Sequence, residues 1–139
     1  ELAAFEKEPD AVEVTVKELE KDGFGEQAIF KCFVAEVDGI VVGTAIAFDR
    51  FSTWKGRIVH LEDLIVKEDM RSHGIGTALL DEVIKYAFKK GAKRVNWEVL
   101  NWNNRAIKLY EQKGAKVLHD WNVVHMDESG IKNYISNLD

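Results

Sequence analysis

The stretch of sequence that decides the fold is IVHLEDLIVKEDMRSHGIGTALLDEVIKYAFKK, residues 58–90. Residues 57–66 are rich in β-formers and predict a largely buried strand. A turn with two glycines follows at residues 71–76, and the next residues repeat apolar side chains every 3.6 positions, which predicts a helix ended by Gly91. The apolar stripe of that helix comprises Ala78, Leu79, Val83, Ile84, Ala87 and Phe88.

The flanking sequence predicts a mixed α/β sheet with helices packed on it. Asp38-Gly39 separates two apolar runs, residues 29–37 and 40–48, and this is the strongest hairpin signal in the chain. Thr15 and Glu18 have the spacing of a capping box and predict a short helix that runs to Gly23. The remaining expected elements are a helix end at residues 1–8, a strand at 94–100, a helix from Asn103 or Asn104 to Gly114, short strands at 116–118 and 122–126, and a helix from about Gly130.

Composition limits the class of protein. The 139 residues suit one domain, and 46% hydrophobic residues with a single proline provide a packed core. The formal net charge of −5 argues against a general nucleic-acid binder and permits a cationic small substrate. The chain has no long apolar run and no signal-peptide pattern, so the expected location is cytoplasmic, with no membrane partner.

The glycine turn is the first candidate for a binding site. Gly74 and Gly76 let backbone N–H groups approach a ligand at a helix N-terminus, a geometry that binds phosphate or pyrophosphate. The Lys-Ser/Thr pair of a P-loop is absent, and the third glycine of a dinucleotide fingerprint would fall at Leu79. The alternative is that the glycines only make a tight turn. Arg71 favours the diphosphate interpretation because it adds a fixed cation.

Two carboxylates and a phenol are the candidate catalytic groups. Glu62 and Asp63 interrupt the apolar strand, and adjacent strand residues point to opposite faces unless a bulge intervenes. Buried carboxylates there are costly and suit general bases or amine-binding groups, whereas an edge position or a salt bridge is the structural alternative. Tyr110 is either a phenolic proton donor or an ordinary core tyrosine.

The remaining reactive residue types give weaker signals. Trp54 and Trp102 either box a cationic amine or cap a core. The lone Cys32 is expected to be a small core residue. None of the histidines has metal-ligand spacing, so no metal is expected; they are His60, His73, His119 and His125.

Three motifs together resemble the GNAT N-acetyltransferase superfamily, within it the diamine (spermidine/spermine) acetyltransferase family. They are Leu61-Glu62-Asp63-Leu64-Ile65-Val66, the turn Arg71-Ser72-His73-Gly74-Ile75-Gly76, and Trp102-Asn103-Asn104-Arg105-Ala106-Ile107-Lys108-Leu109-Tyr110 with Gly114-Ala115. Asp22-Gly23-Phe24-Gly25-Glu26 is similar to the same family. The resemblance implies a GNAT fold with a central mixed, mostly antiparallel sheet and acetyl-CoA as co-substrate. It also implies that the fold begins with a strand and half a helix that precede Glu1.

The resemblance implies roles for individual residues. Tyr110 matches the general acid, and Glu62 matches the carboxylate that helps to deprotonate the amine. The expected cofactor-binding residues are Leu64, Ile65, Val66, Arg71, Ser72, His73, Gly74, Ile75, Gly76, Thr77, Asn103, Asn104, Arg105 and Ala106. The expected substrate-side residues are Phe5, Glu6, Ser52, Thr53, Trp54, Glu62, Asp63, Asn96, Trp97, Glu98 and Asp120.

The expected activity is direct acetyl transfer from acetyl-CoA to a primary amine. The loop at residues 51–57 lacks the acid that polyamine-specific members carry and looks like that of the thialysine acetyltransferase-like branch. Thialysine-like amines and diamines both stay open as substrates. The alternatives are an acyl-CoA-binding domain without catalysis and a protein-lysine acetyltransferase. Family members are commonly dimers, so a homodimer with Trp121 at the interface is expected.

Overall fold

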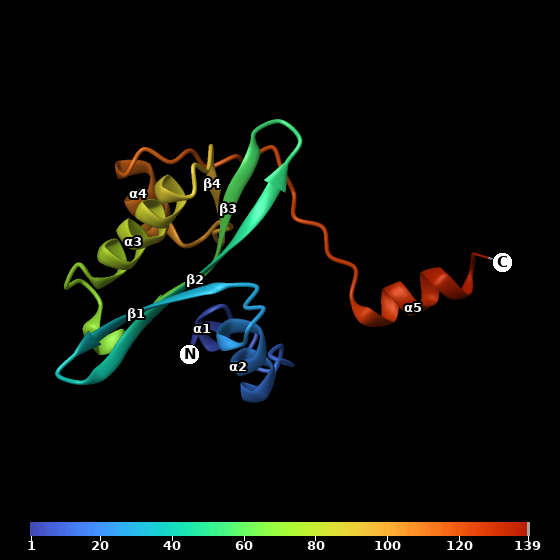
Figure 1. Ribbon diagram of the computed structural model, residues 1–139, viewed down its shortest axis with the longest axis horizontal. Coiled ribbons are helices and arrows are strands. Elements are labelled where there is room, and N and C mark those ends of the chain that lie inside the picture. Colours follow the sequence, from blue (N-terminus) through green and yellow to red (C-terminus); the bar gives the residue numbers. More distant parts are fainter. Residues whose placement is uncertain (139) are drawn as a thin grey trace. The chain divides into compact units, whose positions relative to one another are not determined.

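The first two strands of the sheet, β1 (Lys31–Val37) and β2 (Ile40–Ser52), are joined by the Asp38-Gly39 turn. Asp38 and Gly39 both have positive φ, 51° and 78°, as the tight turn of a two-residue hairpin requires. The computed structural model describes residues 1–138 and divides into two units, Glu1–Asn103 and a second unit that begins at Asn104. Figure 1 shows the hairpin within the first unit. The predicted hairpin is confirmed.

The sheet has the order β1-β2-β3-β4, in which β3 spans Gly56–Val66 and β4 spans Val95–Asn96. β1, β2 and β3 pair antiparallel, whereas β3 and β4 pair parallel. The prediction of a mixed, mostly antiparallel sheet is therefore confirmed. The strand predicted over residues 94–100 is shorter than expected, because β4 follows β3 for only two residue pairs before the chain departs.

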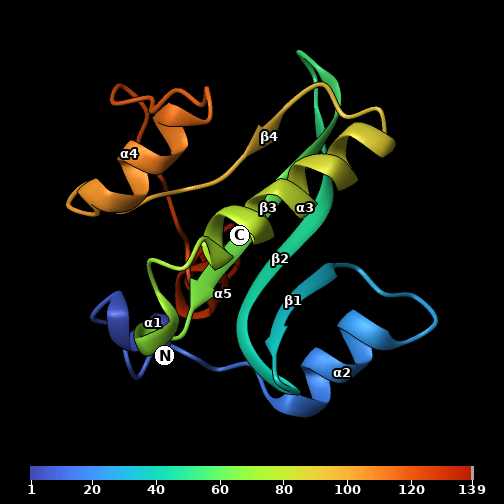
Figure 2. The same ribbon diagram turned by 90° about the vertical axis from the view of Figure 1, so that its left-hand side faces the viewer.

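One helix covers the sheet of the first unit. α3 (Ile75–Lys89) packs along β2 and β3, as Figure 2 shows, and it also contacts β1. Its buried residues are Leu79, Leu80, Val83 and Ala87. Ile84 and Phe88, which the apolar period placed in the core, are 44% and 85% exposed. Ala78 of the predicted stripe is exposed as well, so the buried face of α3 is narrower than that stripe.

The N-terminal helices of the first unit are short. α1 (Leu2–Phe5) ends before the predicted residue 8, whereas α2 (Val16–Phe24) lies where it was predicted. Thr15 and Glu18 form the expected capping box: the Thr15 N–H donates to the Glu18 carboxylate, and the Glu18 N–H donates to the Thr15 hydroxyl. The short 3-10 helix η1 (Glu68–Met70) follows β3 and leads into the glycine turn.

The second unit contains α4 (Asn104–Gln112) and α5 (Glu128–Ser136). Gly114, with φ +90°, follows α4 and ends it as predicted. The strands expected at 116–118 and 122–126 are wrong, because these segments pair with no strand among residues 1–138 and a strand needs a neighbour for its backbone N–H and C=O groups. Exposed apolar side chains line this connection.

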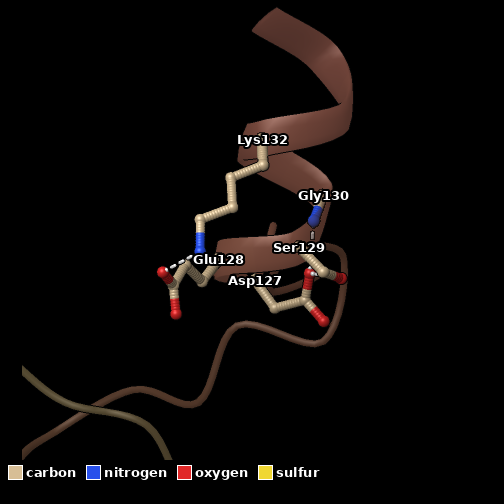
Figure 3. A network of polar contacts seen from close by, with 5 residues as sticks. All are labelled: Asp127, Glu128, Ser129, Gly130 and Lys132. Carbon is tan, nitrogen blue, oxygen red and sulfur yellow. Dashed lines mark hydrogen bonds and ion pairs between the residues drawn. The ribbon is translucent and has the colours of Figure 1, made fainter. Parts of the chain in front are cut away.

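α5 begins two residues before the expected Gly130, because Asp127 caps it. The Asp127 carboxylate accepts hydrogen bonds from the Gly130 N–H at 2.7 Å and the Ser129 hydroxyl at 2.9 Å. An ion pair joins Glu128 to Lys132 on the next turn (Figure 3). These contacts are local to the helix, and α5 buries none of its residues.

Candidate active site

The glycine turn presents backbone N–H groups at the start of α3. Gly74 precedes the helix with φ +80°, a conformation that a side chain disfavours. The Ala78 N–H makes the first bond of the helix, to the Gly74 carbonyl, so the N–H groups of residues 75–77 have no acceptor within the helix. Ser72 also has positive φ, 71°, and His73 Nδ1 lies 3.2 Å from the Met70 carbonyl. The turn therefore has the donors that the predicted diphosphate site requires.

Arg71 is held beside this turn by two contacts. Its Nε donates to the Val66 carbonyl at 3.1 Å, and its guanidinium carbon lies 5.3 Å from the centre of the Phe5 ring. Both contacts restrict the side chain while its terminal nitrogens still carry the positive charge. Sequence interpretation placed Phe5 on the substrate side, whereas the structure places it against a predicted cofactor-binding residue.

The last residues of β3 expose backbone on one side of the strand. β4 pairs with β3 only at Val59 and His60, and no later pair forms among the residues that the structure describes. The Lys67 N–H donates to the Val42 carbonyl of β2. Backbone N–H and C=O groups alternate in direction along a strand, so those of Val66 and Leu64 point away from β2. The backbone groups of Ile65 point toward β2 instead. Leu64 and Val66 thus offer backbone groups to an extended amide chain, as the resemblance implies, and Ile65 does not.

A β-bulge separates the two candidate carboxylates. Ile46 lies opposite Asp63 and Ala47 lies opposite Leu61, so Glu62 is the extra residue of β3. The bulge that the sequence left open as an alternative is therefore present. The Glu62 side chain is 55% exposed, so the expectation of a buried carboxylate is wrong for Glu62. It fits Asp63 better, which is half-buried.

Asp63 lies within a group of three carboxylates. Burial raises the pKa of Asp63, and the negative charges of Glu62 and Glu6 raise it further. The structure thus brings Glu6 of the α1 end to the two carboxylates of β3. Such a group attracts a cation, and this is the chemistry that an ammonium substrate needs.

Phe5 also belongs to an aromatic cluster with Trp102. Their ring centroids are 5.5 Å apart, and Lys7 Nζ lies 5.1 Å from the centre of the Trp102 ring. Trp102 thus contacts a cation of its own chain.

Asn96, Trp97 and Glu98 start in β4 and continue beyond it. Asn96 lies directly opposite His60 of β3, and its Nδ2 is 2.9 Å from His60 Nδ1. His60 Nε2 in turn lies 3.3 Å from Glu62 Oε2. Sequence reasoning considered His60 only as a metal ligand and missed this contact. The signal was present, because His60 and Glu62 are two residues apart on one strand and such residues share a face.

The structure does not bring the loop residues Ser52, Thr53 and Trp54 to the carboxylates. They lie at the tip of the β2–β3 hairpin, where the Ser52 hydroxyl accepts from the N–H groups of Trp54 and Lys55. Glu62 lies six positions after Gly56, which is roughly 20 Å of extended strand. Trp54 is 79% exposed.

The other predicted site residues belong to the second unit, apart from Asn103, which precedes α4. Asn104, Arg105 and Ala106 form the first turn of α4. Tyr110 lies on the same helix, is 8% exposed, and has a pKa raised by its burial. The raised pKa keeps the phenol protonated at neutral pH, as a proton donor requires. Asp120 lies in an exposed turn.

The chain is similar to several known proteins. The family model "Acetyltransferase (GNAT) family" matches residues 3–115. A Thialysine N-epsilon-acetyltransferase of Bos taurus is 40% identical over 126 residues, which are 85% of this chain and 74% of the relative. A Spermidine/spermine N(1)-acetyltransferase-like protein 1 of Homo sapiens is 33% identical over 83% of this chain and 18% of the relative. An integron cassette protein from V. cholerae shares the fold, with a TM-score of 0.77 at 22% identity, over 96% of this chain and 85% of that one.

The chain belongs to the acetyltransferase (GNAT) family, and it is an amine N-acetyltransferase. Acetyl-CoA is the acetyl donor of this family. The turn before α3 has N–H groups and the Arg71 cation, which suit the diphosphate of such a donor. The open edge of β3 has unpaired strand backbone, which suits its pantetheine arm. Within residues 1–138, no helix has the length and apolar content to cross a membrane, and no group of three or more His, Cys, Asp or Glu side chains has an arrangement that could hold a metal ion.

Proposed function

We propose that this chain transfers the acetyl group of acetyl-CoA directly to a primary amine of a small cationic substrate, with a thialysine-like amine preferred over a diamine or polyamine. The observation that carries the proposal is the convergence of Glu6, Glu62 and Asp63, whose mutual repulsion contributes to the raised pKa of Asp63. A cationic substrate relieves that repulsion. The 40% identity to a thialysine acetyltransferase supports the preference.

The proposed reaction begins with loss of a proton from the substrate. An alkylammonium has a pKa near 10, so its nitrogen becomes a nucleophile only after Glu62, directly or through a water molecule, accepts a proton. The nitrogen then attacks the thioester carbonyl. A C–N bond forms as the C–S bond breaks, and backbone N–H groups at the open edge of β3 stabilise the oxyanion.

The proposed reaction ends with protonation of the leaving thiolate. Tyr110 donates its phenolic proton to the coenzyme A sulfur. The acylated nitrogen then loses its excess proton, directly or through water, to the Tyr110 phenolate, which restores the phenol. Because the acetyl group passes directly to the amine, the scheme needs no covalent enzyme intermediate, and Cys32, whose thiol pKa is raised by burial, has no role in it.

The proposed binding of acetyl-CoA assigns its diphosphate to residues 71–77 and its pantetheine arm to Leu64 and Val66. Residues 103–106 would contact the donor further along. Arg71 supplies the positive charge for the diphosphate. The bond between Arg71 Nε and the Val66 carbonyl supports this assignment, because it joins the two parts of the proposed cofactor site.

A panel of amines tests the proposal. Coenzyme A release is measured with thialysine, putrescine and spermidine at matched concentrations, together with a lysine peptide. We expect kcat/KM to be highest for thialysine. Equal or higher kcat/KM for spermidine contradicts the preference, and release with the peptide alone favours a protein-lysine acetyltransferase. Binding of acetyl-CoA without release on any amine favours a regulatory acyl-CoA-binding domain.

We also propose that residues 1–139 act as one GNAT domain in a cytoplasmic homodimer. The second unit exposes a run of apolar side chains, including Trp121 at 67% and Val124 at 88%, and a second copy of the chain is the proposed cover. Light scattering of the purified protein tests the assembly, and Trp121→Ser together with Val124→Ser is expected to shift it toward the monomer.

A further inference from the structure

His60 is a buried, titratable residue to which the scheme above gives no role. It lies in β3, is 8% exposed, and its ring centroid is 5.0 Å from that of Phe48. Both ring nitrogens contact polar groups: Nδ1 lies 2.9 Å from Asn96 Nδ2, and Nε2 lies 3.3 Å from Glu62 Oε2. His60 therefore joins a buried amide of β4 to the exposed carboxylate on the β-bulge.

The contact with Asn96 determines which nitrogen carries the proton. An amide NH2 group only donates, so Nδ1 of His60 accepts, and the proton of the neutral ring resides on Nε2. Nε2 is the ring nitrogen on the side of Glu62, and Glu62 Oε2 lies 3.3 Å from it. The other end of the amide, Asn96 Oδ1, is buried and has no hydrogen-bond partner within the described residues 1–138. Leaving a buried amide oxygen without a partner costs stability.

We propose that His60 is a positioning residue for Glu62, and this inference rests on the proposed function. Its Nε2–H holds Oε2 and leaves Oε1 of the same carboxylate for the ammonium or the intervening water. A glutamate side chain that is 55% exposed samples many rotamers, and a donor on a buried ring restricts them to the reactive one. Asn96 acts one step further away, by fixing the tautomer.

Two substitutions separate the donor from the shape of the ring. His60→Phe keeps an aromatic ring against Phe48 and removes the donor, whereas His60→Gln keeps an N–H at about the position of Nε2. We expect His60→Phe to lower kcat/KM for the best amine about 10-fold, as for loss of a hydrogen bond to a charged group. His60→Gln should retain most of the wild-type kcat/KM for that amine. The dissociation constant of acetyl-CoA should stay unchanged in both.

A double-mutant cycle tests whether His60 acts through Glu62. In the Glu62→Gln background, His60→Phe is expected to cause little further loss, because the acceptor charge has gone. Multiplicative losses overturn the inference. The matched control is Tyr86→Phe, which removes a 3.0 Å hydrogen bond to Asp49 between α3 and β2 and should leave kcat/KM unchanged.

Nitrogen-15 NMR of the wild-type imidazole gives a readout that needs neither turnover nor a variant. We expect the neutral His60 ring to be the Nε2–H tautomer, and a neutral ring with its proton on Nδ1 overturns the inference. The outcomes also distinguish the two proposals. If the wild-type protein acetylates no amine, both the proposed function and the proposed role of His60 are contradicted. If the wild type is active and His60→Phe equals it, only the role of His60 fails.

Discussion

The Nε atom of Arg71 donates a hydrogen bond of 3.1 Å to the carbonyl oxygen of Val66. This bond ties the last residue of β3 to the start of the glycine turn, five positions later in the chain. Because Val66 turns its carbonyl away from β2, the bond uses an acceptor that the sheet leaves available. The two predicted cofactor-binding segments are thus fixed relative to each other by one side chain.

Arg71→Lys should weaken coenzyme A binding. Lysine keeps the charge but loses the Nε donor and the planar guanidinium, so the dissociation constant of coenzyme A is expected to rise about 10-fold. Pantetheine, which lacks the diphosphate, should bind as before. Calorimetric titration with both ligands measures the difference, and Arg50→Lys on the exposed part of β2 is the control. Equal weakening of both ligands contradicts a diphosphate role.

Gly43→Ala should destabilise the first unit. A Cβ atom at this position would lie 3.0 Å from the Ile65 carbonyl oxygen, 3.1 Å from Leu79 Cδ1 and 3.3 Å from Val66 Cγ2. We expect the unfolding free energy to fall by roughly 1–3 kcal/mol, as in other overpacked cores. Urea denaturation measures it. Gly76→Ala is the matched control: its Cβ would meet only Val66 Cγ2 at 3.7 Å, and alanine favours the helix. A wild-type midpoint for Gly43→Ala would show that α3 can move away.

Asp63→Asn should change how stability depends on pH. Burial, Glu62 and Glu6 raise the pKa of Asp63 above its ordinary 3.8, so the folded state binds the proton more tightly than the unfolded state. Stability from this group is therefore present below pH 3.8 and is lost as pH rises through the raised pKa. Relative to wild type, Asp63→Asn should gain stability as the pH rises from 3.8 through the raised pKa of Asp63.

Urea unfolding of both proteins across that pH range tests the sign. Asp38→Asn makes the same chemical change at the exposed hairpin turn and provides the reference. A difference between wild type and Asp63→Asn that stays constant with pH contradicts the raised pKa.

Tyr110→Phe should lower kcat with little effect on the KM for acetyl-CoA. Burial raises the pKa of Tyr110, so the phenol holds its proton at neutral pH, and the ring of phenylalanine fills the same space. Loss of a general acid typically costs about 100-fold or more in rate. Steady-state kinetics measure both constants, with Tyr134→Phe on the exposed α5 as the control. An unchanged kcat removes Tyr110 from the mechanism.

Most of the local structure was predictable from the chain. The Asp38-Gly39 hairpin, the capping box at Thr15 and the glycine turn before α3 each depend on hydrogen bonds or φ values within a few residues. Such features follow from local chemistry, so sequence patterns reveal them. The resemblance that led to the GNAT family also rests on these segments, and the comparisons confirm it.

The two strand predictions that were wrong depend on partners distant in the chain. The apolar residues at 116–118 and 122–126 have the composition of strands, but no neighbouring strand among the described residues accepts their backbone hydrogen bonds. β4 ends at Asn96 for the same reason. The sequence of an isolated apolar run does not indicate whether a partner strand lies beside it in the fold.

The sequence by itself determined most of the elements, the acidic character and the identity of the candidate residues. The tertiary structure decided their environment: it inserted Glu62 as a bulge opposite β2, placed Phe5 against Arg71, and joined Asn96 to His60, 36 residues away. The physical reason is that burial and hydrogen bonding between strands depend on register. A shift of one residue reverses the face of every side chain, and only the assembled sheet defines that register.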